Sequence, residues 1–262
     1  MNPSEQPAEI RLTRPDGRQP REHRSVEIHR GFLRHAEGSA MITQGATRVI
    51  CAASISAALP DFRRGTGGGW VTAEYAMLPR STGVRSPRVT LVPNKRAVEI
   101  SRFLGRCLRA VVDLSAMGPW LIQVDCDVVD ADGGTRCAAL TGGFVALADA
   151  MQFLVAREKR PAWPLRELVA GISIARIEER LVVDPCYEED HRAAIDLTMA
   201  VTGSGRIVEL HAASEASPYE RATLDAMVTL GIEGAHAAFA AQRACGDPCG
   251  RDRAGHCDGE PG

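Results

Sequence analysis

One corner between a strand and a helix constrains the fold of this chain more than any other segment. Residues 121–144 read LIQVDCDVVDADGGTRCAALTGGF, and their first ten side chains alternate between two faces as in a strand. Helical spacing follows, so Gly133-Gly134-Thr135-Arg136 opens a helix whose apolar residues are Leu140, Phe144, Leu147, Ala148, Met151 and Val155. Such a corner suits a phosphate or other oxyanion. Its glycines let the backbone approach a ligand, the N–H groups at the helix start are free to donate, and Thr and Arg add further donors. A plain structural corner has the same pattern, so both interpretations stay open.

Charge is distributed unevenly along the chain. Residues 51–110 contain 10 Lys and Arg against 3 Asp and Glu, whereas residues 111–150 contain 1 against 6. A basic stretch beside an acidic one fits a polyanionic substrate held next to a carboxylate site that binds metal. Solvated surfaces, with compensating charges elsewhere in the fold, explain the same counts equally well, so both explanations stay open.

The remaining composition is that of an ordinary globular protein. The 262 residues are 45% hydrophobic and 24% charged. No uninterrupted apolar run approaches the ~18–20 residues of a membrane span, and the polar start lacks a signal-peptide pattern. We therefore expect a cytoplasmic protein with no membrane partner, and free core thiols at Cys51, Cys107, Cys126, Cys137 and Cys186.

A basic helix is predicted from Lys95 to about Leu114. Asn94 is a plausible N-cap, which places Arg96 in the first turn. A cation there opposes the helix dipole, and its presence is easier to explain if it faces an anion.

A second candidate site lies in the β-rich second half, which begins near residue 164. Asp196 sits in an alternating strand between apolar neighbours, where an ionised carboxylate needs a partner. Asp190 and Asp196 can hold a Mg²⁺ between them. Capping of a turn or pairing with an arginine explains Asp196 equally well. Glu188 and Glu189 are expected to be solvated turn charges.

The two halves echo each other weakly. The segments MITQGATRVICAAS (41–54) and MAVTGSGRIVELHAAS (199–214) both read as strand, glycine turn and strand, which suggests a duplicated unit. Further strands are expected near 168–177, 180–184 and 194–202, with a final helix over 218–242. Cys245, Cys249, His256 and Cys257 lie in a tail without standard metal-ligand spacing, which we expect to be disordered.

Seven segments in colinear order resemble the ribonuclease PH family. They are RPDGRQPRE (14–22), EGSAMITQGATRVICAAS (37–54), RGTGGGWVTAEYAMLPRST (64–82), EISRFLGRCLRAVVDL (99–114), VDCDVVDADGGTRCAALTGGFVALADA (124–150), YEEDHRAAIDL (187–197) and VTGSGRIVEL (201–210). Strings such as GWVTAEY and DADGGTR are highly specific. The resemblance implies an α+β domain over 11–243, built from two related βαβ-type halves with mixed sheets packed against helices. Residues 1–10 would be a flexible lead and 244–262 a disordered tail.

The resemblance also implies an activity and a site. The family trims the 3′ ends of tRNA precursors with inorganic phosphate, releases nucleoside diphosphates, and forms a homohexameric ring built as a trimer of dimers. By motif matching, phosphate binding falls on Arg96, Gly134, Thr135 and Arg136, and catalysis with Mg²⁺ on Asp190 and Asp196. We expect the RNA backbone to be held by Arg63, Arg64, Arg80, Arg85 and Arg88.

The chain departs from the family pattern at several positions that face substrate. The loop between Arg80 and Arg96 is shorter and less basic, with apolar or uncharged residues at 89–92. Cys186, Thr198 and His211 also differ from the family's usual residues. RNA phosphorolysis is the leading hypothesis. The alternatives are a non-catalytic RNA-binding or scaffold subunit, and a phosphorolytic enzyme for another RNA or a small nucleotide.

Overall fold

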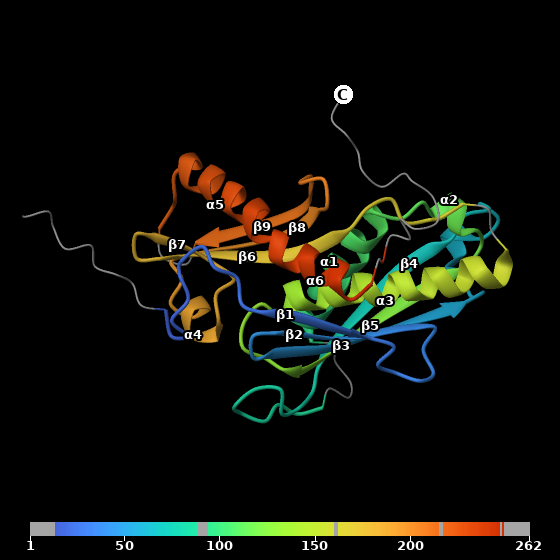
Figure 1. The fold of residues 1–262 in the computed structure, drawn as a ribbon, viewed down its shortest axis with the longest axis horizontal. Helices are drawn as coiled ribbons and strands as arrows, with labels where there is room; N and C mark the ends of the chain where they lie inside the picture. The colour runs from blue at the N-terminus through green and yellow to red at the C-terminus, as the bar shows by residue number, and fades with distance from the viewer. Residues whose placement is uncertain (1–13, 89–93, 160–161, 215–216, 247, 249–262) are drawn as a thin grey trace, which may run out of the picture.

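The computed structural model of the chain describes residues 14–88, 94–159, 162–214, 217–246 and 248. Within these ranges two β-sheets pack against helices, which is the expected α+β architecture (Figure 1). The expected lead 1–10, nearly all of the expected tail 244–262 and the altered loop positions 89–92 lie outside the described residues.

The first sheet has five strands in the order β1-β2-β3-β5-β4. These are β1 (Val26–Arg30), β2 (Gly38–Gln44), β3 (Thr47–Ser56), β4 (Trp70–Met77) and β5 (Leu121–Asp130), with a short 3-10 helix η1 (Asp61–Arg63) before β4. The β2–β3 hairpin turns at Gly45 as predicted. Neighbouring strands are antiparallel except for β4 and β5, which are parallel and joined through α1 (Lys95–Ala110) and α2 (Leu114–Met117).

The second sheet has four antiparallel strands in the order β7-β6-β8-β9. They are β6 (Val169–Ile177), β7 (Arg180–Val183), β8 (Ile195–Thr202) and β9 (Ile207–Ser214), and the one-turn helix α4 (Tyr187–Asp190) connects β7 to β8. The single final helix predicted over 218–242 is wrong, because the segment forms α5 (Arg221–Gly234) and α6 (His236–Ala244). The two helices pack on different elements: α5 contacts β6, β7 and β8, and α6 contacts β1, β6 and α3.

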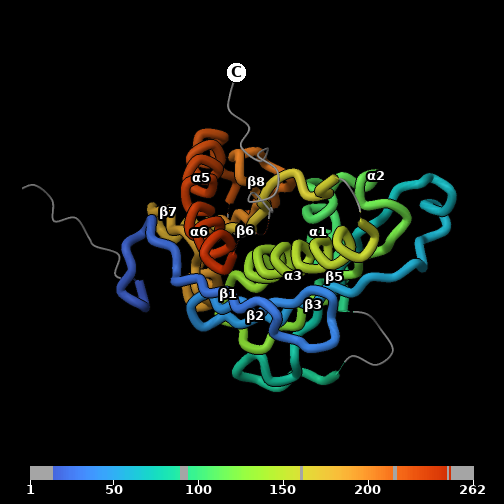
Figure 2. The backbone as a smooth tube through the Cα atoms, turned by 45° about the vertical axis from the view of Figure 1, so that its right-hand side comes forward, coloured from blue at the N-terminus to red at the C-terminus, as the bar shows by residue number. Residues whose placement is uncertain are grey.

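Helix α3 (Thr135–Glu158) is the element shared by both halves (Figure 2). It packs on β2, β3 and β5 of the first sheet and on β6 and β8 of the second. Its length and mean hydropathy of 1.5 would allow it to span a membrane, but 78% of that apolar window is buried inside the protein. Helix α3 is therefore a core helix, and its first residues are held by both sheets.

Buried thiols, as predicted, and an apolar stripe on α1 complete the core. Phe103, Leu104, Cys107 and Leu108 of α1 are fully buried. The five cysteines expected in the core are all buried and free. None of them forms a disulfide among the described residues, so they act as small core residues, and Cys137 also contacts the Ser173 hydroxyl at 3.2 Å.

A buried ionic network joins the start of the described chain to the second half. The Arg24 guanidinium donates to both carboxylate oxygens of Asp184, at 2.6 and 2.8 Å, and Gln44 donates to the same carboxylate at 2.7 Å. Burial alone would raise the pKa of Asp184, but the hydrogen bonds and charge of Arg24 hold that pKa well below its usual range. Arg14 makes a second buried pair with Glu189, at 2.6 Å. The expectation that Glu189 is solvated is therefore wrong, since the distant Arg14 stabilises it inside the protein.

Replacing Arg24 by Met should destabilise the protein by about 3–5 kcal/mol, because the Asp184 charge would remain buried without its main partner. Urea unfolding at pH 7 measures this loss. The matched control is Arg48→Ala, which breaks the exposed Arg48–Asp130 pair and should cost less than about 1 kcal/mol. Equal losses for the two variants would contradict a structural role for the buried pair.

Candidate active site

The glycine corner has a left-handed backbone that favours glycine. Gly133 has φ +73° and Gly134, the N-cap of α3, has φ +66°, a region that residues with a Cβ rarely adopt. A Cβ on Gly133 would lie 2.8 Å from the Pro185 carbonyl oxygen, so only glycine allows this close approach to the second half. The first N–H groups of α3 have no partner within the helix and remain available to a ligand.

Side chains from distant parts of the chain hold this corner in place. The Thr47 hydroxyl donates to the Gly133 carbonyl at 2.7 Å and accepts from the Asp132 N–H at 2.9 Å. Arg24 donates to the carbonyl groups of Asp132 and Gly133. The corner is therefore part of the same buried network as Asp184.

Thr135 and Arg136 are both oriented by residues of the first half. The Tyr75 hydroxyl donates to Thr135 Oγ1 at 2.8 Å. Arg136 Nη2 donates to Glu99 Oε2 at 2.8 Å, and its guanidinium lies over the Phe103 ring at 5.6 Å. One of the five guanidinium donors is occupied by Glu99, which leaves others for an anion.

Arg96 lies in the first turn of α1 as predicted. The Asn94 side chain accepts from the Arg96 N–H at 3.0 Å, which caps the helix. The Arg96 side chain is exposed, and its guanidinium makes no ion pair with any residue that the structure describes. Its positive charge acts on both Asp190 and Asp196.

The two carboxylates predicted to act together lie close enough to repel each other. Asp190 ends α4 and Asp196 is the second residue of β8. Loss of hydration, together with the negative charge of Asp190, raises the pKa of Asp196 to about 6, against the opposing charges of Arg136 and Arg96. Loss of hydration also raises the pKa of Asp190. The structure thus brings Arg96, Arg136, Asp190 and Asp196 to one place.

This carboxylate pair fits a hydrated Mg²⁺ better than a closed metal cage. Neither Asp190 nor Asp196 makes a hydrogen bond or ion pair with its side chain in the described ranges, so the arginine-pairing explanation for Asp196 finds no support there. No cluster of three or more His, Cys, Asp or Glu suited to a metal ion occurs among the same residues. Mg²⁺ commonly takes one or two carboxylates and completes its shell with water and substrate phosphate oxygens.

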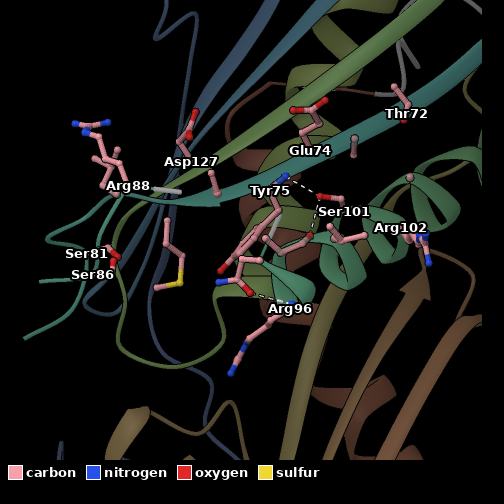
Figure 3. A pocket seen from close by; sticks show the side chains of 18 of the residues that line it. Thr72, Glu74, Tyr75, Ser81, Ser86, Arg88, Arg96, Ser101, Arg102 and Asp127 are labelled. Carbon is pink, nitrogen blue, oxygen red and sulfur yellow. Dashed lines mark hydrogen bonds between the residues drawn. The ribbon is translucent and has the colours of Figure 1, made fainter. Parts of the chain in front are cut away.

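A groove of about 1230 Å³ runs beside the site between β4, α1 and the loop that follows β4 (Figure 3). Its cationic side chains are Arg88, Arg96, Arg102, Arg106 and Arg109. Arg109 closes the far end, where its guanidinium lies 4.3 Å from the centre of the Trp70 ring. The groove and the glycine corner meet at Tyr75, which lines the groove and donates to Thr135, so a ligand in the groove can reach the corner.

The five arginines expected to bind RNA are spread around this groove rather than gathered inside it. Arg88 lines the groove, and Arg63 lies over Trp70 at its far end. Arg64 pairs with Asp61 at 2.9 Å. Arg80 lines a neighbouring cavity of about 590 Å³ and donates to the Gly83 carbonyl. Arg85 is exposed on the loop between Arg80 and Arg88.

Sequence reasoning missed the residues that orient the site. Tyr75, Glu99 and Asp184 all contact it, but each acts on a residue at least 37 positions away, beyond any local pattern. Of the altered positions, Thr198 and His211 are cross-strand partners in β8 and β9, and the His211 ring packs against Phe103 beneath Arg136. Cys186 is the N-cap of α4.

Replacing Asp196 by Asn should stabilise the metal-free protein at pH 7.5. A carboxyl group whose pKa is raised on folding stabilises the folded protein fully below the pKa of the unfolded chain, which is near 4. This stabilisation is lost as the pH rises through the pKa of the folded protein, about 6. We expect a gain of about 1 kcal/mol, reduced from the full pKa shift because Asp196 reaches solvent. Urea unfolding should show the gain shrinking from pH 7.5 to 5. The exposed control Asp225→Asn should change little, and a pH-independent difference for Asp196→Asn would contradict the pKa assignment.

Comparisons with known proteins identify the family of the chain. Residues 22–151 match domain 1 of the 3′ exoribonuclease family, and residues 167–234 match domain 2. The chain is 46% identical to the ribonuclease PH of Moorella thermoacetica over 234 residues, which covers 88% of this chain and 94% of that protein.

Solved structures share the fold at lower identity. A chain of the Archaeoglobus fulgidus exosome with RNA bound to the active site matches with a TM-score of 0.73 at 22% identity, covering 86% of this chain and 91% of its own. Rrp46 of rice (Oryza sativa) matches with a TM-score of 0.70 at 19% identity, covering 88% and 98%. By its two family domains and its identity to ribonuclease PH, the chain belongs to the ribonuclease PH family of phosphorolytic 3′ exoribonucleases.

Proposed function

We propose that this protein is an active exoribonuclease that shortens the 3′ ends of tRNA precursors, with inorganic phosphate as nucleophile and Mg²⁺ as cofactor. One observation carries the proposal. Within the described residues, the glycine corner, the unpaired Arg96 guanidinium and the Asp190–Asp196 pair meet at one place, beside a groove lined by five arginines.

The proposed reaction is a displacement at the phosphorus of the 3′-terminal nucleotide. An oxygen of inorganic phosphate attacks this phosphorus, and the bond to the 3′-oxygen of the preceding nucleotide breaks. The products are a nucleoside diphosphate and an RNA one nucleotide shorter, whose new 3′-oxygen takes up a proton.

Two anions must approach each other in this reaction, so the site has to neutralise them. Arg96, Arg136, the Thr135 hydroxyl and the N–H groups at the start of α3 would bind the attacking phosphate. Asp190 and Asp196 would hold Mg²⁺, which offsets negative charge on the scissile phosphate when bound. Tyr75 and Glu99 would fix the orientation of Thr135 and Arg136.

The proposal extends to the assembly and its location. A homohexamer in the cytoplasm, built as a trimer of dimers, is the arrangement that the family resemblance implies. Light scattering of the purified protein would measure the oligomeric state directly.

The decisive assay incubates the protein with 3′-extended tRNA, Mg²⁺ and phosphate, and identifies the products. Release of nucleoside diphosphates that requires phosphate supports the proposal. RNA binding without products would instead indicate a scaffold subunit. Reaction of short nucleotides, with tRNA left intact, would indicate a phosphorolytic enzyme for a small metabolite.

Two substitutions separate the roles within the site. Arg136→Ala should raise the KM for phosphate about 10- to 100-fold, because charge-assisted hydrogen bonds are lost. Asp196→Asn should reduce turnover about 10³-fold or more while RNA affinity stays close to that of the wild type. Steady-state kinetics and filter binding measure these effects. Arg157→Ala, at the opposite end of α3, is the control and should leave the phosphate KM unchanged. Full activity of Asp196→Asn at low Mg²⁺ would contradict the metal role.

The arginines of the loop after β4 should contribute sequence-independent affinity. Arg85→Ala and Arg88→Ala should each weaken RNA binding to a similar degree for different sequences, and should lower the slope of log affinity against log salt by about 0.7. Binding titrations at several salt concentrations test this. Arg221→Ala on α5 is the exposed control. An unchanged slope in all three variants would exclude the loop from the RNA path.

A further inference from the structure

An exposed aromatic pair flanks Asp190, and the proposed reaction leaves it without a role. Tyr187 and His191 have ring planes within 15° of parallel and centroids 6.2 Å apart. The Tyr187 residue is 64% exposed, although large aromatic side chains usually bury most of their surface. Two parallel aromatic faces in solvent, beside a candidate catalytic carboxylate, suggest a ligand with a flat ring.

The pair lies on the same side of α4 as Asp190. Tyr187, Asp190 and His191 are spaced by three and four residues, which places them together on one face of a helical turn. The His191 N–H donates to the Tyr187 carbonyl at 3.0 Å, so the turn extends through His191. A molecule that contacts Asp190 can therefore contact both rings.

The pair is held rigidly to the anion corner. The Tyr187 N–H donates to Asp132 Oδ1 at 3.2 Å, one residue before Gly133. Glu189, between the two rings in sequence, accepts from the Cys186 N–H at 2.9 Å and is held by the buried Arg14. Because its backbone is fixed before any ligand arrives, the pair has little conformational freedom to lose on binding.

We propose that Tyr187 and His191 form the base-binding shelf for the 3′-terminal nucleotide of the RNA. The inference rests on the proposed function, which places the scissile phosphate at Asp190 and Asp196. The base of the terminal nucleotide is joined to that phosphate through one ribose. The distance between base and phosphate across one ribose is similar to the spacing of about 5–6 Å between side chains one helical turn apart. Stacking requires only the π-face of a base, so the shelf accepts all four bases.

The test uses two RNA oligonucleotides that differ only in a 3′-terminal adenosine or a 3′-terminal abasic nucleotide. Fluorescence anisotropy without phosphate gives the affinity for each RNA, and nucleoside or sugar diphosphate release with phosphate gives kcat/KM. The wild type should prefer the base-bearing RNA by about 5- to 100-fold. Tyr187→Leu should abolish most of this preference, His191→Ala should reduce it, and Tyr187→Phe should retain it. Glu188→Ala, an exposed neighbour outside the shelf, is the matched control.

A merely structural role predicts a different result. In that case Tyr187→Leu would weaken both RNAs by the same factor and keep their ratio, and this outcome would overturn the proposal. Equal binding of the two RNAs by the wild type would overturn it as well. Failure of the proposed function is distinguishable. A Tyr187-dependent preference without any diphosphate release would support the shelf and contradict the exoribonuclease activity. Diphosphate release without the preference would support the activity and contradict the shelf.

Discussion

The buried Arg24–Asp184 ion pair is the contact on which the rest of the structure depends. Arg24 precedes the first strand of one sheet, and Asp184 follows a strand of the other. The same guanidinium also reaches the carbonyl groups at Asp132 and Gly133. One side chain therefore links the two halves and holds the corner between them. Burial of such a pair is costly unless its hydrogen bonds are satisfied, and Gln44 contributes to satisfying them here.

The site itself has the opposite electrostatic character. Asp184 is matched by hydrogen bonds and keeps a low pKa, whereas loss of hydration raises the pKa of both Asp190 and Asp196. The charge of Asp190 raises the pKa of Asp196 further, and neither carboxylate has a hydrogen-bond or ion-pair partner among the described residues. The fold thus neutralises the buried Asp184 carboxylate, but a few residues later it leaves Asp190 and Asp196 without hydrogen-bond or ion-pair partners among the described residues. Perturbed carboxylates beside free cations are typical of functional sites, where a ligand completes the balance of charge.

The sequence predicted the parts of the site that depend on local signals. The glycine corner, the Asn94 cap and the alternation around Asp196 each lie within a few residues, and the structure has all three. The family resemblance supplied the two-sheet architecture. The contacts of Tyr75 with Thr135 and of Glu99 with Arg136 join different elements, so no spacing rule could reveal them. Glu189 was misjudged for the same reason, since its partner Arg14 is 175 positions away. The break between α5 and α6 depends on which surfaces the two helices cover, which is also non-local information.

The central position of α3 has a consequence for the genetics of the protein. The residues that begin this helix belong to the glycine corner, while its body fills the core between the two sheets. A change of side-chain volume deep in the helix can displace the corner, because close-packed interiors transmit strain along rigid elements. Random mutagenesis should consequently find inactivating substitutions along the whole length of α3, in residues that never touch a substrate. The mutational target for loss of function is then much larger than the set of residues in contact with phosphate or RNA.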